Sequence, residues 1–183
     1  KSNFRAGITE PYLFDRNLSG SLDIFREEET FSDVTLEKQG FDTGIGFSAQ
    51  NDYSHRFGYL LAETQTTTKS SKATSTSGDE GAQVVSEVSY VLQQDKRDNR
   101  FDPRSGYYWR VSNNVAGIAG DVQFLKTTVR SQYFMPFNFK RFVIGFGGEV
   151  GVVDGLGENV SRSNRFVIGG KKIRGFARDG IGP

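Results

Sequence analysis

The sequence has 183 residues, of which 36% are hydrophobic and 22 are glycine, with no cysteine and a formal net charge of +1 at pH 7. The length suits one domain, the lack of cysteine excludes a disulfide framework and a cysteine-ligated metal site, and the near-zero charge gives no field that would attract nucleic acid. No apolar run approaches the roughly 18 residues of a transmembrane helix, and the first residues lack the pattern of a signal peptide. The mean hydropathy of -0.50 suits a soluble protein and a transmembrane β-barrel equally, because barrel strands alternate apolar and polar side chains.

That alternation is present along most of the chain. Apolar Phe4, Ala6 and Ile8, for example, share one parity while Arg5 and Gly7 share the other, which is typical of a strand with one wet face. Segments of this kind predict eight strands, at about residues 3–12, 17–27, 36–49, 55–65, 83–97, 106–117, 121–135 and 140–153. The pattern predicts an all-β fold arranged as an antiparallel meander.

The predicted connections differ at the two ends of the strands. Residues 10–17 form a proline-containing turn, and the turn at 50–53 is short. The acidic run at 27–33 is expected to be a solvated loop, and the polar, low-complexity residues 65–81 a long loop on the extracellular side. Short turns at one end and long loops at the other are the arrangement of outer-membrane barrels. Aromatic residues near the short turns predict an interfacial girdle: Tyr12, Phe14, Tyr53, Phe101, Tyr107, Trp109, Phe137 and Phe139.

The last stretch, residues 165–183, is rich in glycine and basic side chains and ends on Pro183, so it is predicted to be a long loop. Within it, Arg174 stands between apolar Ile173 and Phe176, next to a glycine that allows a tight turn. A guanidinium in such a setting favours a carboxylate partner.

Three parts of this stretch together resemble the loop-six signature of the BamA-type outer-membrane assembly proteins, in the bacterial surface antigen superfamily. They are a Gly-Gly pair, a Val/Ile-Arg-Gly-Phe/Tyr tetrad and an Ile-Gly-Pro end, here Gly169, Gly170, Ile173, Arg174, Gly175, Phe176, Ile181, Gly182 and Pro183. Two turns also resemble that family, the Glu-Pro-Tyr turn at residues 10–12 and the turn with Asp98, Pro103 and Gly106.

The resemblance implies that residues 1–183 are part of an outer-membrane β-barrel domain of about sixteen strands, preceded by periplasmic POTRA domains. The chain would run from about the fourth strand to loop six, residues 154–183, which in this family folds back into the lumen. Its arginine would pair with acidic side chains on late strands, and Glu149 is the best candidate partner within residues 1–183.

If the apolar parity faces lipid, the other parity lines the lumen. A charge facing lipid at the midplane would cost ~2–4 kcal/mol, which fixes the assignment wherever a charge falls in mid-strand. The lumenal charges would be Arg5, Asp23, Asp42, Glu87, Arg110, Lys126, Arg130 and Glu149, and the lumenal glycines Gly7, Gly44, Gly46, Gly58, Gly145, Gly147 and Gly151. These glycines either make room for an inserted loop or simply permit the sheet to coil.

The sequence predicts neither an active site nor a cofactor. His55 is the only histidine, so it has no second imidazole for a metal or a catalytic triad. Residues 145–150 begin like a dinucleotide-binding fingerprint but lack its last glycine and the helix that should follow. The acidic pair at Asp79 and Glu80 falls in a polar segment, where solvation explains it.

The interpretation is a non-enzymatic protein of the bacterial outer membrane that assists the folding and insertion of nascent β-barrel proteins. The resemblance implies membrane lipid and nascent barrels as partners, with accessory lipoproteins binding through POTRA domains, and no nucleic acid. A TamA-like or two-partner-secretion transporter is the first alternative, because such proteins share much of loop six. A passive porin and a soluble β-sandwich are further alternatives.

Overall fold

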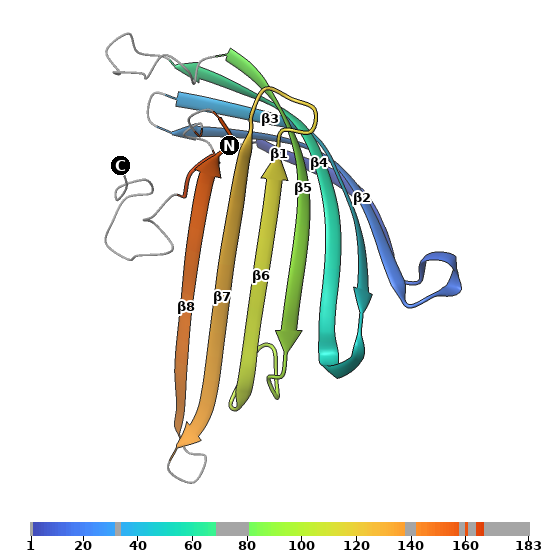
Figure 1. Ribbon diagram of the computed structural model, residues 1–183, viewed down its shortest axis with the longest axis vertical. Helices are drawn as coiled ribbons and strands as arrows, with labels where there is room; N and C mark the ends of the chain where they lie inside the picture. The colour runs from blue at the N-terminus through green and yellow to red at the C-terminus, as the bar shows by residue number, and fades with distance from the viewer. Residues whose placement is uncertain are drawn as a thin grey trace.

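A computed structural model describes residues 2–31, 34–68, 81–137, 142–157, 160 and 164–166. Its eight strands are β1 (Ser2–Glu10), β2 (Leu18–Phe31), β3 (Val34–Ser48), β4 (Tyr53–Thr68), β5 (Gly81–Asp95), β6 (Gly106–Ala116), β7 (Phe124–Phe137) and β8 (Phe142–Gly155). Each strand pairs antiparallel with the next along the chain, in the order β1 to β8 (Figure 1). Short 3-10 turns at Leu13–Asp15 and Gln50–Asp52 join two of the pairs. The predicted all-β meander is confirmed.

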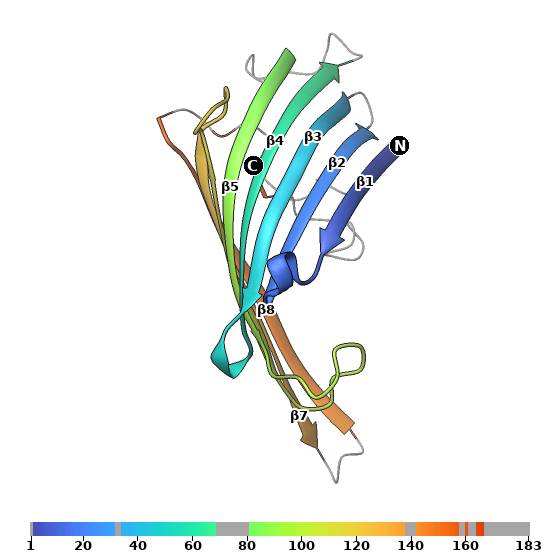
Figure 2. The same ribbon diagram turned by 90° about the vertical axis from the view of Figure 1, so that its right-hand side faces the viewer.

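The sheet is strongly curved and open. Strands β5–β8 form one side and β1–β4 curl round to the other, so that the concave face encloses a space (Figures 1 and 2). Among the described residues, β1 and β8 each pair with one neighbour and not with each other. An unpaired strand edge costs free energy in lipid, and this open sheet is the expected shape for part of a wider barrel.

The register fixes which residues share a face. Arg110 lies opposite Arg130, and Arg130 opposite Glu149, so these three side chains form one row on the concave face. Phe146 lies three residues before Glu149 on the same strand and therefore points to the convex face. The register therefore places these charged residues on one face of the sheet, as the alternation in the sequence predicts.

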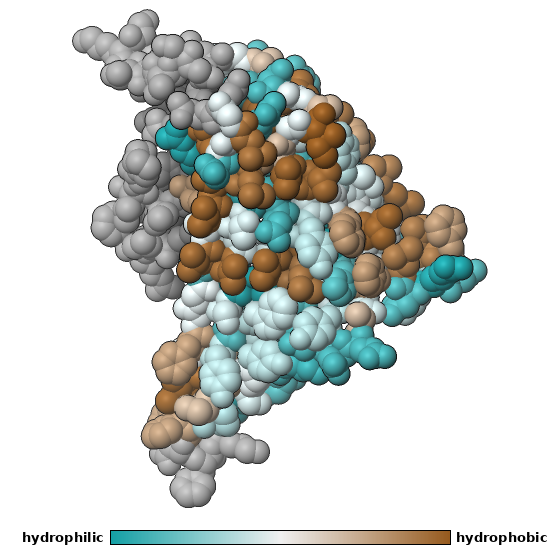
Figure 3. Space-filling view, in the orientation of Figure 1, coloured by the Kyte–Doolittle hydropathy of each residue, from teal (hydrophilic) through white to brown (hydrophobic). Residues whose placement is uncertain are grey.

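The convex face is apolar and uncovered. Phe146 is 63% exposed and Val150 71% exposed, and Ile24, Phe57 and Val129 are exposed on the same face. Apolar side chains gather over β5–β8 in Figure 3, which shows this face. An apolar surface of this extent is rare on a soluble monomer, and it suits contact with lipid.

The predicted aromatic residues that the structure describes lie at or near the turns that follow β1, β3, β5 and β7, while Phe139 lies outside the described residues and the interfacial girdle stays a prediction. Tyr107 Oη and Trp109 Nε1 both donate to Gln94 Oε1, at 3.1 and 3.2 Å. Gln94 is buried and donates in turn to the carbonyl of Asn51 at 2.8 Å. Tyr53 packs edge-on against Trp109. The polar atoms of these rings are therefore satisfied while their apolar edges face outwards, which suits a membrane interface.

The prediction of a solvated loop at residues 27–33 is wrong for residues 27–31, and residues 32 and 33 lie outside the described part of the chain. Glu27, Glu28 and Glu29 lie in β2, and the ladder with β3 continues to the pair Phe31 and Val34. Strands of 14 to 16 residues exceed the ~9–11 residues that cross a bilayer, so their ends extend into water, where charges are tolerated on both faces. The backbone ladder with β3 holds this extension together, and exposed opposite charges such as Arg26 and Glu37, 3.4 Å apart, face each other across it.

The connection between β4 and β5 is also shorter than predicted. Residues 65–68 belong to β4, and Gln65 and Thr66 pair with Ala82 and Gly81 of β5. Threonine and glutamine carry no apolar face, but backbone pairing on both sides keeps them in the ladder. Residues 69–80 lie outside the described part of the chain.

The face assignment predicts opposite responses to charge at two positions on paired strands. In the full-length protein folded into lipid vesicles, Val150→Arg should lower the free energy of unfolding by ~2–4 kcal/mol, because it places a cation against hydrocarbon. Gln132→Arg on the concave face should change it by less than about 1 kcal/mol. Urea unfolding followed by tryptophan fluorescence measures both, and an equal loss at the two positions would contradict the assignment.

Candidate functional site

The concave face is lined with charged pairs on neighbouring strands. Arg130 Nε lies 4.0 Å from Glu149 Oε2 between β7 and β8. Two more pairs lie on β1–β4: Arg56 with Asp42 at 4.0 Å and Arg5 with Glu27 at 3.7 Å. Their side chains are largely exposed, so each pair adds only ~0–1 kcal/mol to stability. Their importance is the polar lining that they give to the enclosed space.

The row across β6–β8 carries more positive than negative charge. Arg110 is directly opposite Arg130, and Glu149 is the acidic residue of the row. Like charges on directly opposite positions of an antiparallel pair are destabilising. This part of the wall is therefore suited to a further carboxylate. Glu149 already lies beside the guanidinium group of Arg130.

A small apolar cluster lies on the same wall, near the ends where β5 and β7 begin and β6 and β8 finish. Its buried residues are Val85, Ala116, Val122 and Phe124, with Val153 and Val160 packed against them. Val160 comes after the end of β8, so a residue beyond the strand packs on the concave face.

A second contact of this returning segment involves β7 and β8. The ammonium group of Lys126 lies 4.5 Å from the centre of the Phe166 ring and donates to the carbonyl of Asn164 at 3.2 Å. The same ring covers Gly151 of β8 so closely that any side chain there would overlap it. Arg165 Nε donates to the carbonyl of Val160 at 2.9 Å, which ties the segment to itself.

The predicted loop motif falls outside the part of the chain that the structure describes. This applies to Gly169, Gly170, Ile173, Arg174, Gly175, Phe176, Ile181, Gly182 and Pro183. Glu149 is described, on the concave face of β8 beside Arg130. Whether it meets Arg174 stays a prediction.

Sequence reasoning missed the contact between Lys126, Phe166 and Gly151. Parity alone places Lys126 and Gly151 on the concave face. Phe166 lies beyond the last predicted strand, so no periodic pattern places it. The one available clue was an aromatic residue shortly after a strand whose concave face is rich in glycine.

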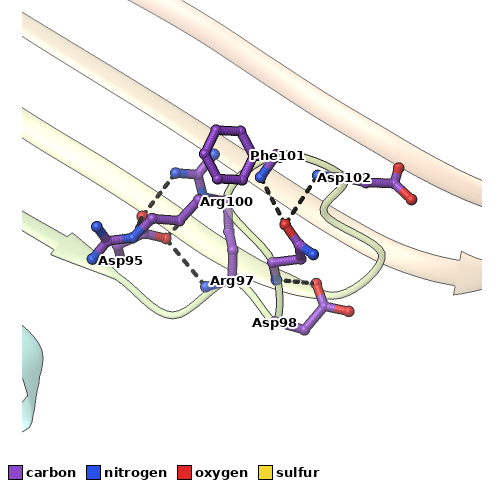
Figure 4. A network of polar contacts seen from close by, with 7 residues as sticks. Asp95, Arg97, Asp98, Arg100, Phe101 and Asp102 are labelled. Atoms are coloured by element: carbon purple, nitrogen blue, oxygen red, sulfur yellow. Dashed lines mark hydrogen bonds and ion pairs between the residues drawn. The ribbon is translucent and has the colours of Figure 1, made fainter.

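The turn between β5 and β6 is held by two carboxylates (Figure 4). Asp95 accepts from Arg97 Nε and Nη2 at 2.8 and 2.7 Å, and Arg100 approaches it at 3.5 Å. The Arg97 guanidinium also lies over the Tyr108 ring, 4.9 Å from its centre. Both members of the Asp95–Arg97 pair are at most 15% exposed, so this bidentate contact is stronger than the exposed pairs of the wall.

Asp98 organises the rest of that turn. Its Oδ1 accepts the backbone N–H groups of Asn99, Arg104 and Ser105, at 2.9, 2.9 and 3.1 Å. The N–H groups of Arg104 and Ser105 are the main reason why the pKa of Asp98 lies below its usual value. Gly106 ends the turn with φ +100°, and a side chain there would overlap the Lys96 carbonyl. The residues Asp98 and Gly106, singled out in the sequence, thus have a structural role.

His55 has a structural role as well. Its Nδ1 lies 3.0 Å from Tyr90 Oη, and its ring stacks on Phe47. Within the described residues no three histidine, cysteine or acidic side chains are grouped to hold a metal ion. In the same part of the chain no helix is long and apolar enough to span a membrane.

Comparisons with known proteins point to one family. The model of the Omp85 superfamily domain matches residues 1–183. The outer membrane protein assembly factor BamA of Neorickettsia risticii (strain Illinois) is 30% identical over 187 residues, covering 100% of this chain and 25% of that protein. The SAM50-like protein CG7639 of Drosophila melanogaster is 27% identical over 172 residues, covering 89% of this chain and 38% of that protein.

A solved structure has the same fold. The crystal structure of BamA from Haemophilus ducreyi lacking POTRA domains 1-3 superposes with a TM-score of 0.87 at 18% identity, covering 99% of this chain and 38% of that one. At this identity the likeness concerns the fold alone. The chain spans a quarter to two fifths of the length of these relatives.

The turn geometry predicts that Asp98→Ala releases the backbone of residues 99–105, because three N–H groups lose their acceptor. Amide hydrogen exchange there should become faster, while Asp102→Ala, on an exposed side chain of the same turn, should leave it unchanged. The Asp98 carboxylate has a lowered pKa, so its contribution is present above the usual value of 3.8 and is lost as the pH falls through the lowered pKa. Protection that persists in Asp98→Ala would contradict this role.

Proposed function

The chain belongs to the Omp85 superfamily, and from this premise we propose that it forms part of the barrel of a BamA-like assembly factor. The complete protein assists the folding and insertion of β-barrel proteins into the bacterial outer membrane. The observation that carries the proposal is the match over the whole chain to a protein named as an outer membrane protein assembly factor. The apolar convex face also suits contact with the lipid of the outer membrane.

The barrel assists folding by offering a strand edge for pairing, without an enzymatic step. In the complete protein, a weakly paired seam between the first and last strands offers an edge to which a substrate strand adds by backbone hydrogen bonding. The eight strands described here form the opposite, firmly paired wall. Its convex face anchors the protein in lipid, and its polar concave face receives the last loop. Nascent barrel proteins are the substrates, and accessory lipoproteins bind through POTRA domains.

Within this proposal, Arg174 of the last loop fixes the loop inside the lumen. Its guanidinium needs carboxylate partners, and Glu149 is the candidate on the described wall. Because Arg130 already lies 4.0 Å from Glu149, that carboxylate would be shared between two guanidinium groups. A second carboxylate, from strands beyond Pro183, completes the bidentate pairing that arginine favours.

The alternatives have less support. The relatives that match over most of the chain are named as an assembly factor and a SAM50-like protein, which does not favour a TamA-like or two-partner-secretion transporter. A soluble β-sandwich needs a second sheet against the apolar face, whereas the described strands form a single sheet.

The proposal predicts that the full-length protein, reconstituted in liposomes, speeds the membrane folding of a denatured outer-membrane β-barrel protein relative to empty liposomes. Arg174→Lys should slow this reaction by about tenfold or more, because lysine cannot form the paired contacts of a guanidinium. Arg178→Lys, in the same stretch but outside the motif, is the matched control. The measurement is the rate at which the heat-modifiable, folded form of the substrate appears.

The two parts of the proposal fail separately. A parent protein that does not speed folding contradicts the assembly function. A parent that speeds folding, with Arg174→Lys as active as Arg178→Lys, contradicts only the role of Arg174.

A further inference from the structure

We propose that the concave face of β7 and β8 contains a docking slot for Phe166, formed by Gly151 below the ring and Lys126 beside it. The slot holds the base of the last loop against the wall and sets where the rest of the loop leaves it. Lys126 and Gly151 are positioning residues for that loop. The effect of this slot on barrel assembly rests on the proposed function, but the existence of the slot does not.

Gly151 provides the space for the ring. A side chain at this position would overlap three atoms of the Phe166 ring. The backbone of Gly151 is outside the left-handed region in which glycine is favoured, so its conformation does not require glycine. Of the two explanations for the lumenal glycines, room for an inserted segment therefore applies to Gly151.

Gly147 makes a direct comparison possible. It lies four residues earlier on the same strand and on the same face. A Cβ built there meets its nearest atoms, Gln132 Cγ and the Ser131 carbonyl, at 3.5 and 3.6 Å, which is ordinary van der Waals contact. Gly147 therefore has room for a methyl group, whereas Gly151, under the Phe166 ring, does not.

Lys126 holds the segment by two different interactions. Its ammonium group lies 4.5 Å from the centre of the Phe166 ring, within the range of a cation–π contact. It also donates a hydrogen bond to the Asn164 carbonyl at 3.2 Å. Lys126 lies opposite Asn114 of β6 and Val153 of β8, so its backbone is paired with a strand on each side and its position is fixed by the wall.

A second attachment lies six residues earlier. Val160 packs on the apolar cluster of the wall, and Arg165 bonds back to the Val160 carbonyl at 2.9 Å. The segment is therefore held at both of its ends, by apolar contact at Val160 and by the slot at Phe166. Two attachments restrict the direction of the chain far more than one, which lowers the entropy lost when the following residues bind.

The test measures amide hydrogen exchange of residues 160–166 in the full-length protein folded in lipid nanodiscs. Gly151→Ala should raise the exchange rate about tenfold, which corresponds to ~1.4 kcal/mol of local stability. Gly147→Ala, the matched control, should stay within about twofold of the parent. Heat-modifiable migration of each variant confirms that the barrel has folded.

A second pair of variants tests Lys126 without changing the shape of the wall. Lys126→Met keeps most of the apolar stem and removes the charge, and it should raise the exchange rate about threefold to tenfold. Lys126→Arg keeps a cation able to stack and donate, and it should restore slow exchange. A merely structural role of the side-chain stem would leave Lys126→Met unchanged.

The slot is refuted if Gly151→Ala exchanges no faster than Gly147→Ala, or, should Gly151→Ala not fold, if Lys126→Met and Lys126→Arg exchange alike. The experiment involves no substrate. A parent protein that fails to speed substrate folding would therefore count against the proposed function and leave the slot standing.

Discussion

Strands that cross a bilayer have to satisfy every backbone hydrogen bond within the sheet while presenting apolar side chains to lipid on one face only. Strands β2 to β7, which are paired on both sides, meet both demands through a register in which each of the seven strand pairs keeps the same two faces from β1 to β8. The exposed apolar residues, the lumenal charges and the placement of the last loop all depend on that register. A one-residue slip in any pair would place charges such as Arg130 and Glu149 against hydrocarbon.

The concave face does more than tolerate polar residues. Several of its charges form ion pairs across strands, and the row of Arg110, Arg130 and Glu149 has an excess of positive charge. Its glycines leave space close to the backbone, and at Gly151 that space is filled by Phe166. Charged rows on this wall can pair with polar groups of a loop, and glycine positions such as Gly151 leave space for its side chains. Such a wall can hold a loop at a few positions without filling the lumen. The proposed role of the last loop in a BamA-like assembly factor requires such a wall.

Much of this fold could be predicted from the sequence, because period-two alternation reports directly on which face of a sheet meets lipid. Parity alone places Glu149 and Lys126 on the concave face. The acidic end of β2 could not be placed in this way, since Glu27 to Glu29 look like a solvated loop until their pairing with β3 is known. The contact between Phe166 and Gly151 joins an irregular segment to a strand, so no periodicity reports it. The motif around Arg174 was identified by resemblance, and its contacts stay predictions.

The central claim is that neighbouring residues of the wall alternate between lipid and a water-filled lumen. The chain has no cysteine, so single cysteines at positions 146 to 150 of the full-length protein, with any cysteine outside residues 1–183 replaced, can be labelled in liposomes against no background from this region. The account predicts that a charged, water-soluble thiol reagent labels positions 147 and 149, while positions 146, 148 and 150 react only with a lipid-soluble reagent. Uniform labelling along β8, or the opposite alternation, would contradict it.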